Sequence, residues 1–290
     1  MKDWILATRP KTLTASIVPI VSASALSFYH GSFDAYISVL AFLSALMIQI
    51  SCNLFNDVID FEKGADTDER IGPQRITQSG KAGISTVRRV AFATCFIAVI
   101  LAIPLVFVGG FPIVLVGLLS LLFAYAYTGG PFPLAYLGIA DVFVVFFFGI
   151  VAVGGVFYLQ TGTLHLDILL LGLQVGLLCN ILLAINNFRD MHQDRKVNKN
   201  TLAARFGERF IKNEISLLFF VPFIMCFYWY LTGRLNAALW VFVLFPASTY
   251  LCFKIIKSKP SPTLNKYLGL SSLFYLSFGM ILSLALVFDK

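Results

Sequence analysis

The sequence predicts an all-α, polytopic membrane protein with nine transmembrane helices around a central cavity, which cytoplasmic loops cap. Two observations support this fold class. The chain of 290 residues is 58% hydrophobic and only 13% charged, whereas soluble domains are about 25% charged. Its apolar residues also form long runs that do not alternate with polar ones, which argues against a transmembrane strand barrel.

The individual spans follow from the length of the apolar runs. A membrane-spanning helix needs roughly 20 consecutive apolar residues. Most turns between the runs are short and rich in Gly, Pro and polar residues, as expected between antiparallel helices. We expect one membrane-embedded domain over 1–290. The predicted spans are 12–30, 35–55, 88–108, 111–128, 134–158, 166–187, 214–232, 236–256 and 268–288.

The positive charges indicate the orientation. All of the 22 Lys and Arg residues except Arg234 and Lys290 fall at the N-terminus or in loops on that same side. Because cytoplasmic loops carry the excess of Lys and Arg, we expect the N-terminus to be cytoplasmic, in a bacterial inner membrane. The net charge of +7 therefore reflects topology, and nucleic-acid binding is not expected.

Two predicted connections, 58–87 and 188–213, are long and charged. Loops of this length in a compact protein are usually functional or disordered. The first contains Ile71 and Ile76, so we expect a short structured cap. Both follow an even-numbered span and begin with similar acidic and amide residues, which suggests a diverged internal duplication.

An acidic stripe is expected at the end of the second span. Asn53, Asn56, Asp57 and Asp60 follow the spacing i, i+3, i+4, i+7, which places them on one face of a helix. A carboxylate within a membrane costs about 2.5–3.5 kcal/mol. These side chains therefore require cations and a hydrated cavity.

A second stripe, at the end of the sixth span, comprises Asn186, Asn187, Asp190 and Asp194. Carboxylate and amide oxygens suit Mg²⁺, which commonly bridges carboxylates to a substrate phosphate. Zinc would favour His and Cys at ligand spacing. Arg side chains, which match phosphate oxygens well, follow both stripes.

Together the stripes and the basic residues predict a metal–diphosphate site at the cytoplasmic membrane surface, with a lipid tail between the helices. The alternative is that both clusters are solvated loop ends that only set the topology. The basic residues concerned are Lys63, Arg70, Arg75 and Lys81 after the first stripe, and Arg189, Arg195, Lys196 and Lys199 within or after the second.

These motifs resemble those of the UbiA superfamily of intramembrane aromatic prenyltransferases, specifically its 1,4-dihydroxy-2-naphthoate polyprenyltransferase branch. Asp66 fits the NDxxDxxxxxD spacing of that branch, whereas the commoner NDxxDxxxD would place its last acid at Gly64. Asn198 stands where family members often have Gly. The other matching stretches are Trp4, Arg9–Thr12, Asp68–Arg75, Tyr127–Pro133 and Lys199–Ala203.

The resemblance implies transfer of a polyprenyl group from polyprenyl diphosphate to 1,4-dihydroxy-2-naphthoate, with loss of diphosphate and CO₂, giving demethylmenaquinone. The implied catalytic Mg²⁺ ligands are Asp57, Asp60, Asp66, Asp190 and Asp194. The implied substrate-binding residues are Asn53, Asn56, Arg70, Arg75, Tyr127, Asn186, Asn187, Arg189 and Lys199. Aromatic rings that could stabilise an allylic cation include Tyr125, Tyr127 and Phe132.

Several alternatives remain open from the sequence. Asp141, in the otherwise apolar fifth span, either orients or deprotonates the acceptor or is a buried carboxyl bonded to a neighbouring helix. The acceptor could instead be another aromatic such as 4-hydroxybenzoate, although the position of Asp66 favours the naphthoate. A cation-coupled transporter is the alternative from a different class; its ionisable groups would lie near the bilayer midplane, not at the cytoplasmic ends.

Overall fold

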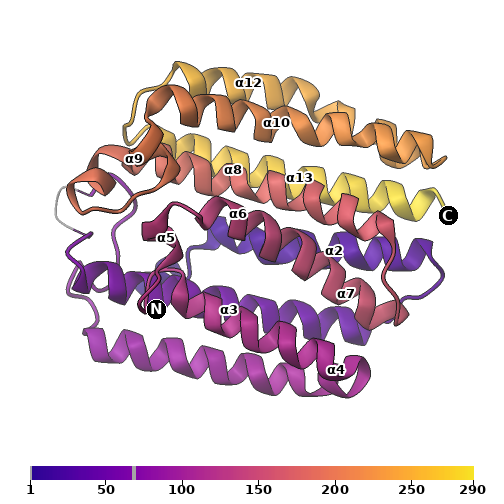
Figure 1. The fold of residues 1–290 in the computed structure, drawn as a ribbon, viewed down its shortest axis with the longest axis horizontal. Helices are drawn as coiled ribbons and strands as arrows, with labels where there is room; N and C mark the ends of the chain where they lie inside the picture. The colour runs from indigo at the N-terminus through magenta and orange to yellow at the C-terminus, as the bar shows by residue number, and fades with distance from the viewer. Residues whose placement is uncertain (1, 67–69) are drawn as a thin grey trace.

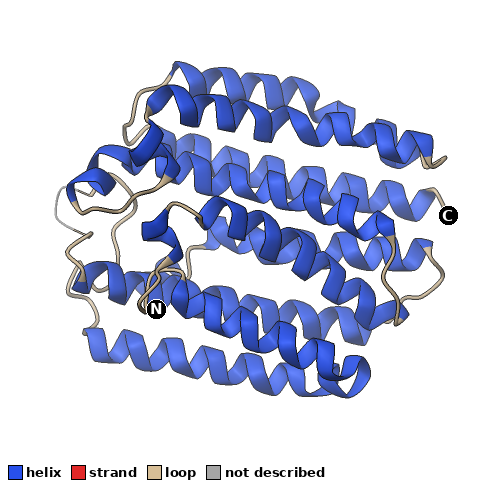
Figure 2. Ribbon diagram, viewed as in Figure 1, coloured by secondary structure: helices blue, strands red, loops and turns tan. Residues whose placement is uncertain are grey.

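The computed structural model describes residues 2–66 and 70–290, and over these residues every regular element is a helix (Figure 2). The predicted match at Asp68 lies outside the described residues. The elements are α1 (Lys2–Ala7), α2 (Pro10–Tyr29), α3 (Ala35–Glu62), α4 (Ile84–Ala126), α5 (Leu134–Leu137), α6 (Ala140–Val144), the π-helix η1 (Val145–Val151), α7 (Ala152–Thr161), α8 (Leu166–Lys196), α9 (Leu202–Phe206), α10 (Glu208–Leu231), α11 (Leu235–Leu239), the 3₁₀-helix η2 (Trp240–Leu244), α12 (Phe245–Lys257) and α13 (Leu264–Phe288).

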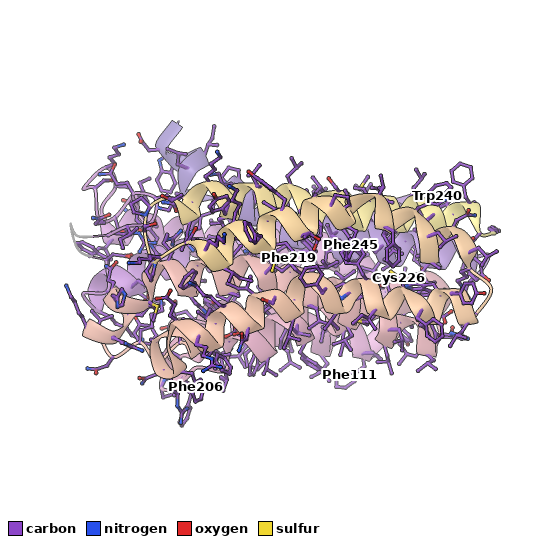
Figure 3. The ribbon with its side chains drawn as sticks, turned by 90° about the horizontal axis from the view of Figure 1, so that it is seen from above. Phe111, Phe206, Phe219, Cys226, Trp240 and Phe245 are labelled. Atoms are coloured by element: carbon purple, nitrogen blue, oxygen red, sulfur yellow. The ribbon has the colours of Figure 1, made fainter. Side chains whose placement is uncertain are left out.

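The long helices run side by side along one direction, and α5, α9 and the segment after α3 gather at one end of the bundle (Figure 1). Seen from above, side chains project outward along the length of the bundle (Figure 3). Large apolar side chains such as Phe111 and Phe253 are more than half exposed. Such a surface requires an apolar solvent, so the chain is an integral membrane protein.

The predicted count of nine spans is not exact. Over the described residues, eight helices are long and apolar enough to cross a membrane. The difference arises in α4, which covers both of the predicted spans 88–108 and 111–128. Gly110 interrupts α4 with a φ of 63° and a ψ of −153°, and the chain folds back there (Figure 1). Glycine adopts this backbone conformation without steric cost, so no separate loop is needed.

The middle of the bundle contains a close helix contact built from glycines. A Cβ on Gly149 of η1 would lie 2.2 Å from the carbonyl oxygen of Gly172, and one on Gly176 would lie 2.4 Å from that of Val145. Gly172 and Gly176 form a GxxxG pair on α8. Small residues at this spacing let helix backbones approach closely in membranes, so η1 packs directly against α8.

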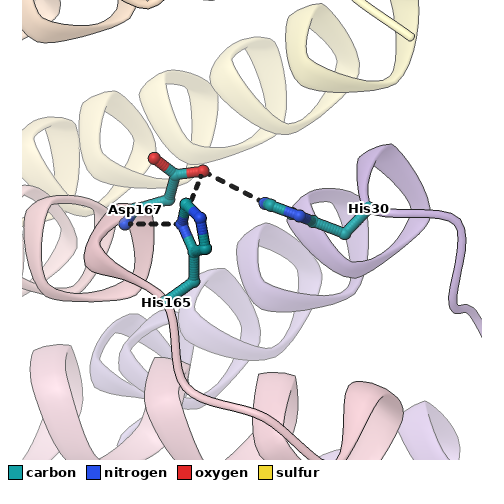
Figure 4. A group of neighbouring side chains, drawn as sticks. All are labelled: His30, His165 and Asp167. Carbon is teal, nitrogen blue, oxygen red and sulfur yellow. Dashed lines mark hydrogen bonds and ion pairs between the residues drawn. The ribbon is translucent and has the colours of Figure 1, made fainter.

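The far end of the bundle is held by a buried ion-pair cluster around Asp167. Its carboxylate accepts hydrogen bonds from Arg234 (2.5 Å) and Tyr228 (2.5 Å), and His30 and His165 lie within 3.2 Å of the same carboxylate (Figure 4). Two His and one Asp could in principle hold a metal ion. Arg234 already forms an ion pair with the Asp167 carboxylate and neutralises its charge. We therefore interpret the cluster as a structural contact that joins the ends of α2, α8 and α10.

Candidate functional site

Both predicted stripes lie on the last turns of long, continuous helices. The helix α3 extends to Glu62 and α8 extends to Lys196. The prediction of a long connection over 188–213 is therefore wrong, because α8, α9 and α10 occupy nearly all of it. The polar residues of the second stripe do not end α8. Their side chains line a cavity inside the protein, so the helix can continue past the apolar stretch to Lys196.

The two stripes meet in one polar cavity of about 310 Å³, although they are far apart in the sequence. Asp57 and Asp60 line it from α3, and Asp190 and Asp194 line it from α8. The structure also brings most of the other predicted site residues to this cavity: Asn56, Arg70, Arg75, Tyr127, Asn186, Asn187, Arg189 and Lys199.

The carboxylate of Asp60 is surrounded by donors. It accepts hydrogen bonds from Arg75 Nη2 (2.9 Å) and from the Tyr136 hydroxyl (2.9 Å), and Lys199 Nζ lies 3.6 Å away. Burial and the Asp60 charge raise the pKa of Tyr136, so its hydroxyl keeps the proton that it donates. Asp60 is thus a fixed negative charge between two cations.

Asp57 holds the cap, whose described residues are 63–66 and 70–83, against the bundle, and Asp66 joins two parts of the cap to each other. Asp66 pairs with Arg70 and with Arg75 Nε (2.9 Å), but it is not among the residues that line the polar cavity. Asp57 accepts hydrogen bonds from the backbone N–H groups of Ile76 (3.2 Å) and Thr77 (3.3 Å) and from the Thr77 hydroxyl. The expected structured cap is confirmed, and buried Ile76 anchors it.

On α8, Asp190 forms a two-pronged ion pair with the neighbouring Arg189, with distances of 2.8 Å and 2.6 Å. Arg189 Nη1 also donates to Asn265 of α13 (2.7 Å), and the Asn265 amide donates to the carbonyl of Ile71 in the cap (3.1 Å). A Cβ on Gly72 would lie 2.9 Å from Arg189 Nη2. These contacts link α8, α13 and the cap beside the cavity.

Arg9 is a cation that lacks a full set of partners. Its Nη2 atom is shielded from solvent and has no hydrogen-bond partner among the described residues. Removal from water, followed by the positive charges of Arg75 and Arg70, lowers the pKa of Arg9 to about 10. An anion bound in the cavity would relieve both effects, so Arg9 marks where a phosphate group fits.

A second, mostly apolar cavity of about 250 Å³ continues from the polar one. Arg9, Thr12, Asn56, Tyr127 and Asn186 line both cavities. The apolar cavity extends among α2, α3, α4, η1 and α8, and its wall includes three mutually packed rings, Phe123, Phe143 and Phe147. This arrangement suits a ligand with an anionic head and an apolar tail.

Some predicted residues lie elsewhere. Asn53 lines only the apolar cavity, and its amide donates to the carbonyl of Thr8 (2.9 Å). Tyr125 and Phe132 are described residues that line neither cavity. The roles of Thr77, Tyr136 and Asn265 were missed, because no local spacing marks a contact between residues that are distant in the sequence. Arg9 was not among the predicted site residues either, although the match of the Arg9–Thr12 stretch to the family could have indicated it.

The donor set fits a divalent cation. The polar cavity offers carboxylates from two facing helix ends together with amide oxygens, which are the hard ligands that Mg²⁺ prefers. Asp60 and Asp190 already have cationic partners, whereas Asp57 and Asp194 accept hydrogen bonds from neutral groups. A metal ion with a bound diphosphate could therefore exchange with the cations of the first two without leaving unpaired charge.

A helical membrane protein whose polar, acid-lined chamber adjoins an apolar cavity belongs to the class of intramembrane proteins that act on lipid-like anions. The family model described as the UbiA prenyltransferase family matches residues 16–283. The chain therefore belongs to the UbiA prenyltransferase family.

Relatives within the family are similar over most of their length. The 1,4-dihydroxy-2-naphthoate octaprenyltransferase of Escherichia coli is 38% identical, over 71% of this chain and 68% of that protein. The protein of the same description from Bacillus subtilis is 30% identical, over 97% of this chain and 92% of that protein. The solved structure of a UbiA homolog from Archaeoglobus fulgidus bound to DMAPP and Mg²⁺ superposes with a TM-score of 0.67 at 14% identity, covering 97% of this chain and 99% of that one; it shows the fold alone.

Proposed function

We propose that this protein transfers a polyprenyl group from polyprenyl diphosphate to 1,4-dihydroxy-2-naphthoate, with loss of diphosphate and CO₂, giving demethylmenaquinone. The observation that carries the proposal is the meeting of the α3 and α8 carboxylates in one cation-rich cavity that continues into an apolar one. The choice of acceptor is supported by the descriptions of the E. coli and B. subtilis relatives.

In this proposal Asp60, Asp190 and Asp194 hold Mg²⁺, with Asp57 at the edge of the same set. The metal would neutralise charge on the diphosphate as it leaves. Asp66 lies behind the cavity and holds Arg70 and Arg75 in place. It therefore acts on the site through these arginines, which differs from the direct ligand role that the resemblance implied.

The chain's own cations complete the diphosphate site. Arg9, Arg75 and Lys199 line the polar cavity and would stabilise the negative charge that develops on the leaving group. The ring of Tyr127 lies where the two cavities join and would be next to the allylic carbon, and aromatic faces stabilise cations. The apolar cavity would exclude water from this carbon and hold the prenyl chain.

We place the active site at the cytoplasmic face of a bacterial inner membrane and treat the whole chain as one domain. The distribution of Lys and Arg supports this orientation, since the polar cavity lies at the end of the bundle that carries most of them. Both substrates would then reach the cavity from the cytoplasmic leaflet.

The test is an assay of the purified protein with Mg²⁺, a polyprenyl diphosphate and either 1,4-dihydroxy-2-naphthoate or 4-hydroxybenzoate. We expect prenylated product and CO₂ release with the naphthoate only, and loss of the product when Mg²⁺ is chelated. Product with hydroxybenzoate alone would overturn the acceptor assignment. Ion flux in proteoliposomes without any prenylated product would overturn the enzyme assignment.

A further inference from the structure

Three helices bring a pair of carboxyl groups and an amide together at the wall of the polar cavity. Asp141 of α6 lies within hydrogen-bonding reach of Glu214 of α10 and of Asn180 of α8. The Asn180 amide donates to Glu214 Oε1 at 3.4 Å. None of these residues belongs to the acidic stripes that form the diphosphate site.

The hydrogen bonding of this group indicates a shared proton. Apart from the nearby Asn180 amide and a backbone N–H, which do not reach full hydrogen-bond geometry, no N–H or hydroxyl donor of the described residues satisfies either oxygen of Asp141 or Glu214 Oε2. Two ionised carboxylates have no proton to share and repel each other, whereas one proton between them makes a hydrogen bond. One proton shared between the two carboxyls satisfies this contact and leaves one negative charge on the pair within the membrane span.

The pair extends from the cavity towards the outside of the bundle. Asp141 is only 4% exposed and lines the polar cavity together with Tyr127 and Lys199. Glu214 does not line the cavity and is partly exposed, two turns from the start of α10. The π-helix η1 begins four residues after Asp141, and such segments often accompany functional sites.

We propose that Asp141 is the general base for the aromatic acceptor, and that Glu214 and Asn180 position it and share its proton. This inference rests on the proposed prenyl transfer. A carboxylate that already shares a proton with a neighbour can take up a second proton and return it, as coupled carboxyl pairs do. Of the two interpretations of Asp141, a residue that deprotonates the acceptor or a buried carboxyl bonded to a neighbouring helix, this proposal adopts the first.

The proposed step balances without any further reactant. Asp141 takes the proton of the ring hydroxyl next to the carboxylated carbon, and the electron pair of the broken O–H bond moves into the ring. That carbon bonds to the allylic carbon while the C–O bond to diphosphate breaks and its electron pair leaves with diphosphate. The resulting ring ketone loses CO₂, its C–C electron pair restores the ring as a naphtholate, and Asp141 returns the proton.

The first variant is Asp141→Asn, which keeps the shape but removes the base. We expect kcat for prenyl transfer to fall by about 10²–10⁴-fold, with Mg²⁺-dependent binding of prenyl diphosphate and the thermal unfolding temperature unchanged. Prenyl transfer at the wild-type rate would overturn the proposal. So would equal loss of prenyl-diphosphate binding, because the residue would then serve the diphosphate site or the fold.

The second variant is Glu214→Gln, with Glu208→Gln as its matched control on the same helix. Glu208 forms an ion pair with Lys212 on the surface (2.7 Å), so its variant should behave as the wild type. In Glu214→Gln we expect a lower kcat and an acid limb of the pH profile moved to higher pH, because the protonated Glu214 carboxyl that donates to the ionised Asp141 is replaced by the weaker amide donor. Among the described residues, Glu214 and Tyr127 are titratable groups beside Asp141, and Lys199 lines the same cavity. An unchanged profile would contradict the shared proton.

The two proposals fail in different ways. If the wild type forms no prenylated naphthoate, the proposed function is wrong and the Asp141 experiment is read with whichever acceptor is active. If the wild type is active and both variants match it, only the role of the Asp141 pair is wrong.

Discussion

In the polar cavity the chain itself supplies cationic partners to Asp60 and Asp190, and Arg75 pairs with two carboxylates. Its guanidinium donates to Asp60 and pairs with Asp66, each at 2.9 Å. Burial lowers the pKa of Arg75, but the charges of the surrounding carboxylates, Asp60 and Asp66 first among them, together outweigh burial and raise it above its ordinary value. Arg75 therefore stays charged and fixes the relative positions of α3 and the cap.

Arg75→Lys tests whether the planar guanidinium of Arg75, which contacts Asp60 and Asp66 at once, contributes more than its positive charge. Lysine keeps the positive charge but cannot bridge two carboxylates with a planar fork. Since removing one partner of a buried ion pair costs about 3–5 kcal/mol, we expect lower thermal stability and a loss of activity. Arg88→Lys is the control, because the Arg88–Glu62 pair is exposed and such pairs contribute little. Equal behaviour of the two variants would contradict this role.

Arg9→Gln tests the unpaired cation. Because Arg9 is held among other cations without a full set of partners, its removal should leave thermal stability unchanged or raise it. Binding of prenyl diphosphate should weaken about 10- to 100-fold, as expected for a lost hydrogen bond to a charged group. Binding is measured by titration calorimetry and stability by thermal unfolding in detergent. A destabilised variant with normal binding would show that Arg9 is structural.

At the scale of elements, the site depends on the contact between η1 and α8. Gly149, Gly172 and Gly176 let the two backbones touch, and α8 carries the second stripe while η1 and α6 carry the wall with Asp141. A displacement of η1 would therefore move Asp141 relative to Asp190 and Asp194.

Gly176→Ala tests this contact. A Cβ there would lie 2.4 Å from the carbonyl oxygen of Val145, which is backbone and cannot rotate away. We expect a loss of about 1–3 kcal/mol in the free energy of unfolding, as for other overpacked cores, and reduced activity. Gly117→Ala, where a Cβ would meet nothing within 4 Å, should be neutral or slightly stabilising. Thermal unfolding of both proteins checks the difference, and a stable Gly176→Ala protein would contradict the close contact.

At the scale of the molecule, sequence patterns sufficed for the class and for the two acidic stripes, but they ended α3 and α8 too early, since the helices extend to Glu62 and Lys196. Apolar length predicted most spans, and helical spacing placed Asp57 and Asp60 on one face. The break between the predicted spans 88–108 and 111–128 coincides with the reversal at Gly110, although the structure makes that turn within α4 and without a separate loop. Local spacing also could not show that Asp57 binds the cap through Thr77 or that Asp66 pairs with Arg75 inside the cap, since both contacts depend on how the cap folds.

The most direct test of the whole account is Mg²⁺-dependent binding of a prenyl diphosphate to the wild type, Asp60→Asn, Asp190→Asn and the double variant. Asp60 and Asp190 come from helices far apart in the sequence and line one cavity. If they share one metal–diphosphate complex, each single variant should abolish most of the Mg²⁺-dependent binding, and the double variant should lose little more. Mg²⁺-dependent binding at wild-type affinity in either single variant, or losses that simply add, would contradict a shared site.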